Sequence, residues 1–153
     1  QKVSQKIILS LFILLLTSLV IVSVLDHRYA VSKVPVVLTI IAYLMVLFGI
    51  YIIYRVSKEN SFASATIEVD QGQSVISSGT YAIVRHPMYS GALSVFIFTP
   101  IALDSFIGII PAGMIMIILM MRAVDEEAFL KGHLSGYSEY CGRTRYRLLP
   151  YVW

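Results

Sequence analysis

Charged residues and cysteine are scarce in this chain. Of its 153 residues only 14% are charged, whereas 58% are hydrophobic, and the mean hydropathy is +0.79. This composition excludes an ordinary soluble domain and predicts a membrane protein. The single cysteine, Cys141, excludes an intramolecular disulfide, and we interpret it as a spectator. The net charge of +3 requires no nucleic-acid partner, because the basic residues flank apolar segments instead of forming a stripe.

The apolar residues fall into long blocks, and a helix needs roughly 20 of them to cross a bilayer. We therefore predict an all-α integral membrane protein with about four transmembrane helices, at about residues 7–25, 35–55, 87–103 and 106–124. A loop at 56–86 and a tail at 125–153 would lie outside the membrane, in a single domain that covers residues 1–153. The first apolar run is too long for the core of a signal peptide, and no small-residue cleavage site follows it.

The last two predicted helices are separated by a polar interruption at 103–105. Pro87 lies 18 residues before Ser105, and Arg122 lies 17 residues after it. Two antiparallel helices that rise about 1.5 Å per residue would therefore return to the same depth. We expect a helical hairpin whose two polar ends are neighbours.

The basic residues predict the orientation of these helices. Four spans place the N-terminus, the long loop and the C-terminal tail on one side, which then holds ten of the twelve Lys and Arg residues. Only Arg28 and Lys33 lie on the other side. Because basic loops stay inside, we expect both termini and the active site on the cytosolic side of a multi-pass protein.

The segment 79–91, GTYAIVRHPMYSG, concentrates polar and aromatic residues where a helix begins. Pro87 suits a first helical turn, and a helix N-terminus attracts anions. With Arg85 and His86 beside it, this end could hold a carboxylate or a phosphate. In the alternative interpretation, Arg85 extends to lipid head groups and Tyr81 and Tyr89 belong to an interfacial aromatic belt.

The other end of the hairpin reads RAVDEEAFL. Arg122 and Glu126 are four residues apart and share a helix face, while Glu127 turns away by about 100°. A solvated helix end would explain the charges of Asp125 and Glu127. The charge of Glu126 needs another explanation, and a bound cation would supply one. A cation site beside an anion site fits the amino-acid portion of S-adenosylmethionine, whereas NADPH fits Glu126 poorly.

Three segments together resemble a known family. SSGTYAIVRHPMYSG, RAVDEEAFL and GYSEYCGRTRYRLLP, within roughly residues 70–150, resemble the prokaryotic isoprenylcysteine carboxyl methyltransferases, a group related to the phospholipid methyltransferases. The resemblance implies a membrane methyltransferase without a Rossmann fold, and the chain contains no GxGxxG sequence. It further implies S-adenosyl-L-methionine as cofactor, a tail folded back over it, and a lipid-facing entrance for a lipophilic substrate.

The resemblance also implies roles for individual residues. Glu126 would hold the amino group of the cofactor, and Arg122 would orient the carboxylate of the substrate. The remaining cofactor-binding residues would be Gln73, Ser74, Val75, Ile76, Tyr81, His86, Pro87, Met88 and Tyr89, with Arg85, Glu127 and Arg145 as further candidates and no metal. The family often has His at the position of Gln73. Its Phe-Gly is replaced here by the shorter 134–136, LSG, which indicates a subgroup with its own substrate.

Several functions stay open at this point. Methyl transfer is an in-line displacement, and a carboxylate or thiolate acceptor needs no base, whereas an amine must lose a proton. This favours an isoprenylcysteine-like carboxylate or a thiol over a phospholipid amine. Membrane sterol reductases, which use NADPH, also carry Arg-His-Pro-x-Tyr and a tail like YRLLPYVW. A non-enzymatic membrane adaptor is the third alternative, and the oligomeric state is open.

Overall fold

The computed structural model describes residues 2–60, 69 and 72–153. Every regular element among them is a helix: α1 (Lys2–Tyr29), α2 (Val36–Glu59), the short 3-10 helix η1 (Gly79–Ala82), α3 (Pro87–Ala102), α4 (Ile109–His133) and α5 (Tyr137–Arg143). The all-α prediction is confirmed for these residues. The middle of the predicted loop, at 61–68 and 70–71, lies outside the described residues.

Two of the helices are long and apolar enough to cross a membrane. They are Lys6–Tyr29 and Val36–Glu59, with mean hydropathies of 3.0 and 2.7, and the apolar helix α3 is shorter, at 16 residues. Large apolar side chains such as Leu14, Leu47 and Ile110 are exposed on the outer faces of the helices. An apolar surface of this extent suits contact with lipid, which agrees with association of the chain with a membrane.

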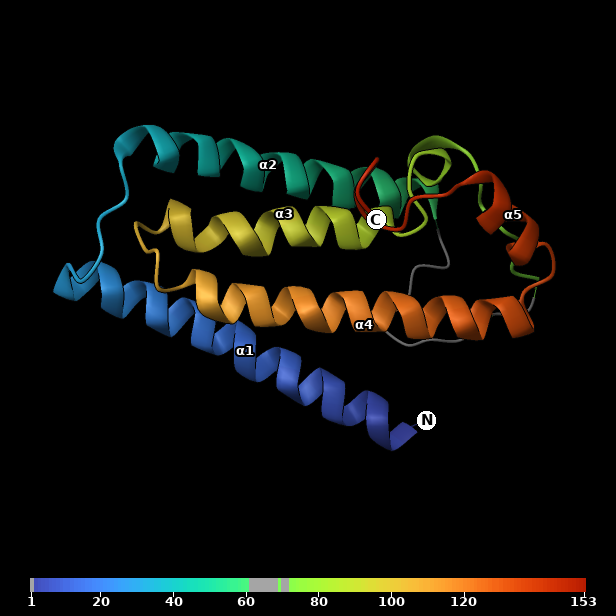
Figure 1. The fold of residues 1–153 in the computed structure, drawn as a ribbon, viewed down its shortest axis with the longest axis horizontal. Coiled ribbons are helices and arrows are strands. Elements are labelled where there is room, and N and C mark those ends of the chain that lie inside the picture. The colour runs from blue at the N-terminus through green and yellow to red at the C-terminus, as the bar shows by residue number, and fades with distance from the viewer. Residues whose placement is uncertain (1, 61–68, 70–71) are drawn as a thin grey trace.

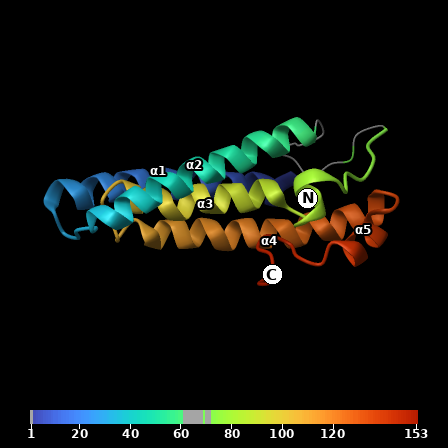
Figure 2. The same ribbon diagram turned by 90° about the horizontal axis from the view of Figure 1, so that it is seen from above.

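Helices α2, α3 and α4 lie side by side, and α1 packs across α4 (Figures 1 and 2). The contact between α2 and α3 is close, because a Cβ atom on Gly49 would lie 2.6 Å from the backbone oxygen of Gly91. Small residues allow helix backbones in membranes to approach in this way. The hydroxyl of Ser94 adds a hydrogen bond of 2.8 Å to the backbone oxygen of Met45.

At one end of the helix bundle, polar side chains link the α1–α2 connection to the α3–α4 connection by hydrogen bonds. We call Asp26, Ser32, Asp104 and Ser105 the far-end clasp. The Asp26 carboxylate, which is buried, accepts hydrogen bonds from Ser32 N (2.7 Å), Ser32 Oγ (2.5 Å), Ser105 Oγ (2.6 Å) and Ile107 N (3.3 Å). Asp104 accepts a bond of 2.8 Å from the backbone N–H of Val34. The clasp holds the α3–α4 connection at the end opposite η1 and α5 (Figure 1).

The helix bounds differ from the sequence prediction mainly in α1, which extends beyond the predicted 7–25 at both ends, and in α4. This helix continues to His133 instead of ending near residue 124. Arg122, Glu126 and Glu127 therefore all lie within the helix, and the acidic residues do not mark its end. The predicted loop contains η1, and the predicted tail contains α5.

Candidate functional site

The C-terminal tail packs along the beginning of α3. Pro87 is the first residue of this helix, and the residues just before it hydrogen bond to the tail through their backbones. Arg85 N donates to Tyr146 O and His86 N to Arg147 O, both at 2.9 Å. The tail thus folds back onto the RHPMY segment, while its predicted position over a cofactor stays a prediction.

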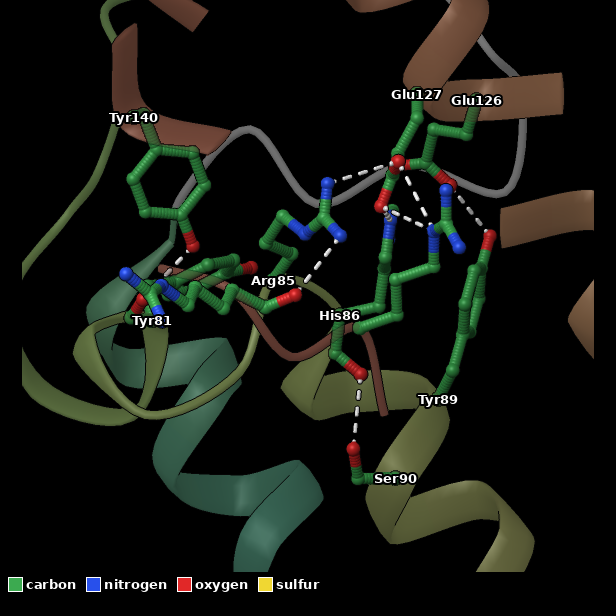
Figure 3. Close-up of polar contacts among 10 residues, drawn as sticks. Tyr81, Arg85, His86, Tyr89, Ser90, Glu126, Glu127 and Tyr140 are labelled. Carbon is green, nitrogen blue, oxygen red and sulfur yellow. Dashed lines mark hydrogen bonds and ion pairs between the residues drawn. The ribbon is translucent and has the colours of Figure 1, made fainter. Parts of the chain in front are cut away.

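Tyr89 connects α3 to two polar residues of α4. Its hydroxyl donates to Glu126 Oε2 at 2.7 Å and accepts a hydrogen bond from Arg122 Nε at 2.9 Å. The Tyr89 ring stacks on the His86 ring, with centroids 5.5 Å apart and an interplanar angle of 10°. His86 and Glu126, 40 positions apart in the sequence, therefore flank the same tyrosine (Figure 3).

Glu127 lies beside this group and is only 2% exposed. Its carboxylate contacts Arg85 Nη1 at 3.0 Å, Arg147 Nε at 3.1 Å and His86 Nε2 at 3.3 Å (Figure 3). The interpretation of Glu127 as part of a solvated helix end is therefore wrong, whereas Asp125 is exposed as expected. The physical reason is that α4 continues past Glu127. This side chain therefore projects from the body of the helix towards the beginning of α3 and the tail.

We call Glu127, Arg85, His86 and Arg147 the Glu127 cluster. The apolar part of α4 ends at Met121, so the cluster lies beyond it. Burial opposes the charge of Glu127, but the hydrogen bonds from His86 and Arg147 and the charge of Arg85 outweigh burial and hold its pKa below the ordinary value. Arg85 and His86 thus contact a carboxylate of the protein itself. Any ligand anion at this helix end would have to share them with Glu127.

A second group of contacts fixes Tyr81 at the end of α2. Asn60 Nδ2 donates to the Tyr81 hydroxyl at 2.7 Å, and the Tyr140 hydroxyl donates to Tyr81 O, also at 2.7 Å. Burial raises the pKa of Tyr81, and the negative charge of Glu126 adds to this effect. Hydrogen bonds from the end of α2 and from α5 thus hold Tyr81 in place.

The short helix η1 is itself docked on α2. Glu59 accepts hydrogen bonds from Thr80 N (2.7 Å) and Thr80 Oγ1 (2.6 Å). Gly79 has a φ of +61°, and a Cβ atom there would lie 2.5 Å from the Glu59 carboxylate. Only glycine satisfies both the backbone conformation and the close approach.

The other residues predicted for the site lie in several environments. Val75 packs together with Tyr81 against the buried side chains of Leu134, Tyr137 and Tyr140. Its neighbours Gln73, Ser74 and Ile76 are in a segment, 72–78, that forms no helix or strand. Pro87 is buried and Met88 half-buried in the first turn of α3. The Arg145 side chain is exposed, and its backbone oxygen accepts a bond of 3.1 Å from Arg85 Nη2.

Three residues that stabilise the site had no role assigned from the sequence. Arg147 contacts Glu127 from the tail, and its guanidinium also lies 5.0 Å from the centroid of the Trp153 ring. Glu59 and Asn60 hold η1 and Tyr81 from the end of α2. Each acts on a partner about 20 positions away, so no local spacing pattern could have identified it. The ligand-binding roles of the residues predicted from the resemblance stay predictions.

Comparison with known proteins identifies the family. Residues 37–135 match the model of the phospholipid methyltransferase (PEMT) family. The chain is also similar to Delta(14)-sterol reductase TM7SF2 of Mus musculus, with 32% identity over 91 residues, which cover 58% of this chain but 22% of that relative. The family match spans more than half of the chain and includes both the RHPMY segment and the two adjacent glutamates. The sequence resemblance is confirmed at this level: the chain belongs to the phospholipid methyltransferase family.

Proposed function

We propose that this protein is an integral membrane methyltransferase that uses S-adenosyl-L-methionine to methylate a lipophilic acceptor. The acceptor group that we favour is a carboxylate, as in an isoprenylcysteine. The observation that carries the proposal is the hydrogen-bonded series Arg122, Tyr89 and Glu126, which sets a cation and an anion of α4 side by side at the beginning of α3. Membership of the family supports methyl transfer as the class of reaction.

The residues present fit the charges of this cofactor. A carboxylate offers about four lone-pair sites, and Tyr89 uses one of those of Glu126, a residue that is only partly buried. Glu126 can therefore bind an ammonium group. When bound, S-adenosylmethionine would supply an electrophilic methyl group on a sulfonium, whose positive charge also suits Glu126.

The guanidinium of Arg122 is suited to bind the carboxylate of the acceptor. Its Nε is fixed by the Tyr89 hydroxyl, so the guanidinium is oriented beside Glu126. A guanidinium matches the geometry of a carboxylate, and a carboxylate nucleophile needs no general base. The protein then has to align the carboxylate oxygen with the methyl carbon and to exclude water, and the buried side chains around the site favour both.

The membrane arrangement is part of the proposal. Four helices, α1 to α4, would cross the bilayer and place the site on the cytosolic side, where ten of the twelve basic residues would lie. A lipophilic acceptor would enter from the bilayer between helices with apolar outer faces. Membrane lipids are then the surroundings and the source of the substrate.

Other acceptors and one other reaction compete with this proposal. A phospholipid amine or a lipophilic thiol would use the same cofactor site. The partial similarity to a sterol reductase favours, as a second candidate, an NADPH-dependent membrane enzyme. A non-enzymatic adaptor would bind neither cofactor.

Calorimetric titration of the purified protein with S-adenosylmethionine and with NADPH separates these classes. We expect binding of the first compound alone. Binding of NADPH alone would favour a reductase, and binding of neither would favour an adaptor. Labelled S-adenosylmethionine with a farnesylated cysteine, a phosphatidylethanolamine and simple thiols would then identify the acceptor, and we expect the carboxyl group of the farnesylated cysteine to be labelled.

A further inference from the structure

Tyr137, the first residue of α5, has a buried hydroxyl group. The residue is 4% exposed, and its hydroxyl oxygen has no hydrogen-bond partner within the part of the chain that the structure describes. A buried polar atom without a partner loses the free energy of its bonds to water. Buried tyrosine hydroxyls usually have a partner, so this atom requires an explanation.

The neighbours of Tyr137 belong to the proposed cofactor site. Val75 and Tyr81, both predicted to contact the cofactor, pack against the buried cluster that Tyr137 forms with Leu134 and Tyr140. Burial raises the pKa of Tyr137 above its ordinary range, and the charges of Cys141, Glu127 and Glu126 act in the same direction. The hydroxyl is therefore neutral at physiological pH, and its ring belongs to a cluster against which two of the predicted cofactor contacts pack.

Tyr140 gives an internal comparison on the same helix. It is 2% exposed, and its hydroxyl donates to the backbone oxygen of Tyr81 at 2.7 Å. Two tyrosines one turn apart are thus similarly buried, but the described residues provide a hydrogen-bond partner for only one of the two hydroxyls. The Tyr137 hydroxyl is consequently available to a ligand at no cost in internal hydrogen bonds.

We propose that Tyr137 is a cofactor-binding residue whose hydroxyl hydrogen bonds to a neutral polar atom in the nucleoside part of S-adenosylmethionine. The assignment rests on the proposed function. A neutral hydroxyl suits a ribose hydroxyl or a ring nitrogen, while the charged Glu126 suits the ammonium group. To reach the Tyr137 hydroxyl, the ligand has to displace apolar side chains such as Val75. This residue belongs to a segment, 72–78, that forms no helix or strand.

The test compares Tyr137→Phe with the matched control Tyr140→Phe. Each substitution removes one hydroxyl from a similarly buried ring. For Tyr137→Phe we expect the melting temperature of the ligand-free protein to stay the same or to rise, because no internal hydrogen bond is lost. Its dissociation constant for S-adenosylmethionine, measured by calorimetry, should increase about tenfold, which corresponds to about 1.4 kcal/mol. Tyr140→Phe should instead lower the melting temperature of the ligand-free protein.

Two outcomes would overturn the assignment of Tyr137. The first is an unchanged dissociation constant for S-adenosylmethionine in Tyr137→Phe. The second is a melting temperature of Tyr137→Phe as low as that of Tyr140→Phe, because the hydroxyl would then have a structural partner. If the wild-type protein does not bind S-adenosylmethionine at all, the proposed function fails as well, and this result is distinct from both of the others.

Discussion

Substitution of glutamine for each of the two adjacent glutamates of α4 should have different effects, mainly on stability at Glu127 and mainly on cofactor affinity at Glu126. Glu127 is buried and contacts two arginines and His86, and the Arg85 side chain is itself only 9% exposed. Glu127→Gln keeps the size of the side chain but leaves Arg85 without its charge partner. Removal of one member of a buried pair costs about 3–5 kcal/mol. Because the Arg147 side chain is 31% exposed and can turn towards water, we expect a loss of about 3 kcal/mol, at the lower end of this range.

Glu126→Gln is the matched control. Glu126 is only partly buried, and a glutamine oxygen can still accept the hydrogen bond from Tyr89. The stability should therefore fall by about 1 kcal/mol or less. The affinity for S-adenosylmethionine should decrease by roughly 10-fold to 100-fold, because a charge-assisted hydrogen bond to the ammonium group is lost.

Thermal unfolding in detergent micelles, followed by far-ultraviolet circular dichroism, measures the first effect, and calorimetric titration measures the second. For a chain of this length about 1 kcal/mol corresponds to about 2–4 °C. The melting temperature should therefore fall by about 6–12 °C in Glu127→Gln and by no more than about 4 °C in Glu126→Gln. If Glu127→Gln melts like the wild type, or if Glu126→Gln is the less stable of the two, the assignment of a structural role to Glu127 and a ligand role to Glu126 is refuted.

Three further results are expected. The ordinary pKa of Glu127 is 4.5 and its pKa in the folded protein is lower, so its stabilising charge is fully present above about pH 4.5 and is lost as the pH falls through the folded value. Melting temperatures measured as a function of pH should show this acid-side loss in the wild type, and an equal loss in Glu127→Gln would contradict it. Asp26→Asn should lower the melting temperature by weakening the far-end clasp but leave the affinity for S-adenosylmethionine unchanged, because the clasp lies at the opposite end of the bundle. Arg122→Ala should impair turnover of the acceptor more than cofactor binding, and a variant that loses only cofactor affinity would exclude Arg122 as the residue that orients the substrate.

Hydropathy and spacing determined the class of this protein without any structure. Long apolar runs have one stable form in a membrane, because a helix satisfies its own backbone hydrogen bonds. The positions of α1, α2 and α3 follow from this rule and from the prolines that precede α2 and begin α3. The i, i+4 spacing likewise placed Arg122 and Glu126 on one face, and both contact Tyr89.

Neither the last residue of α4 nor the contacts of Glu127 could be predicted from hydropathy and residue spacing. A polar stretch after an apolar run is compatible with either a solvated end or a continued helix, and only packing against the tail distinguishes them. The tail brings Arg147 to Glu127, a contact between residues 20 positions apart. In the same way, the contact of Asn60 with Tyr81 depends on how α2 meets η1, which no local pattern encodes.

The sequence by itself thus predicted apolar helices suited to a membrane and a polar helix face that carries Arg122 and Glu126, because local hydropathy and helical periodicity are properties of the chain alone. The tertiary structure decided which of these polar residues pair with one another. It turned Glu127 inwards to hold Arg85, His86 and the tail together, left Glu126 beside Tyr89 and Arg122, and buried the Tyr137 hydroxyl in the cluster with Leu134 and Tyr140. The physical reason is that pairing and burial depend on contacts between segments far apart in the chain, and these contacts exist only once the helices and the tail have packed.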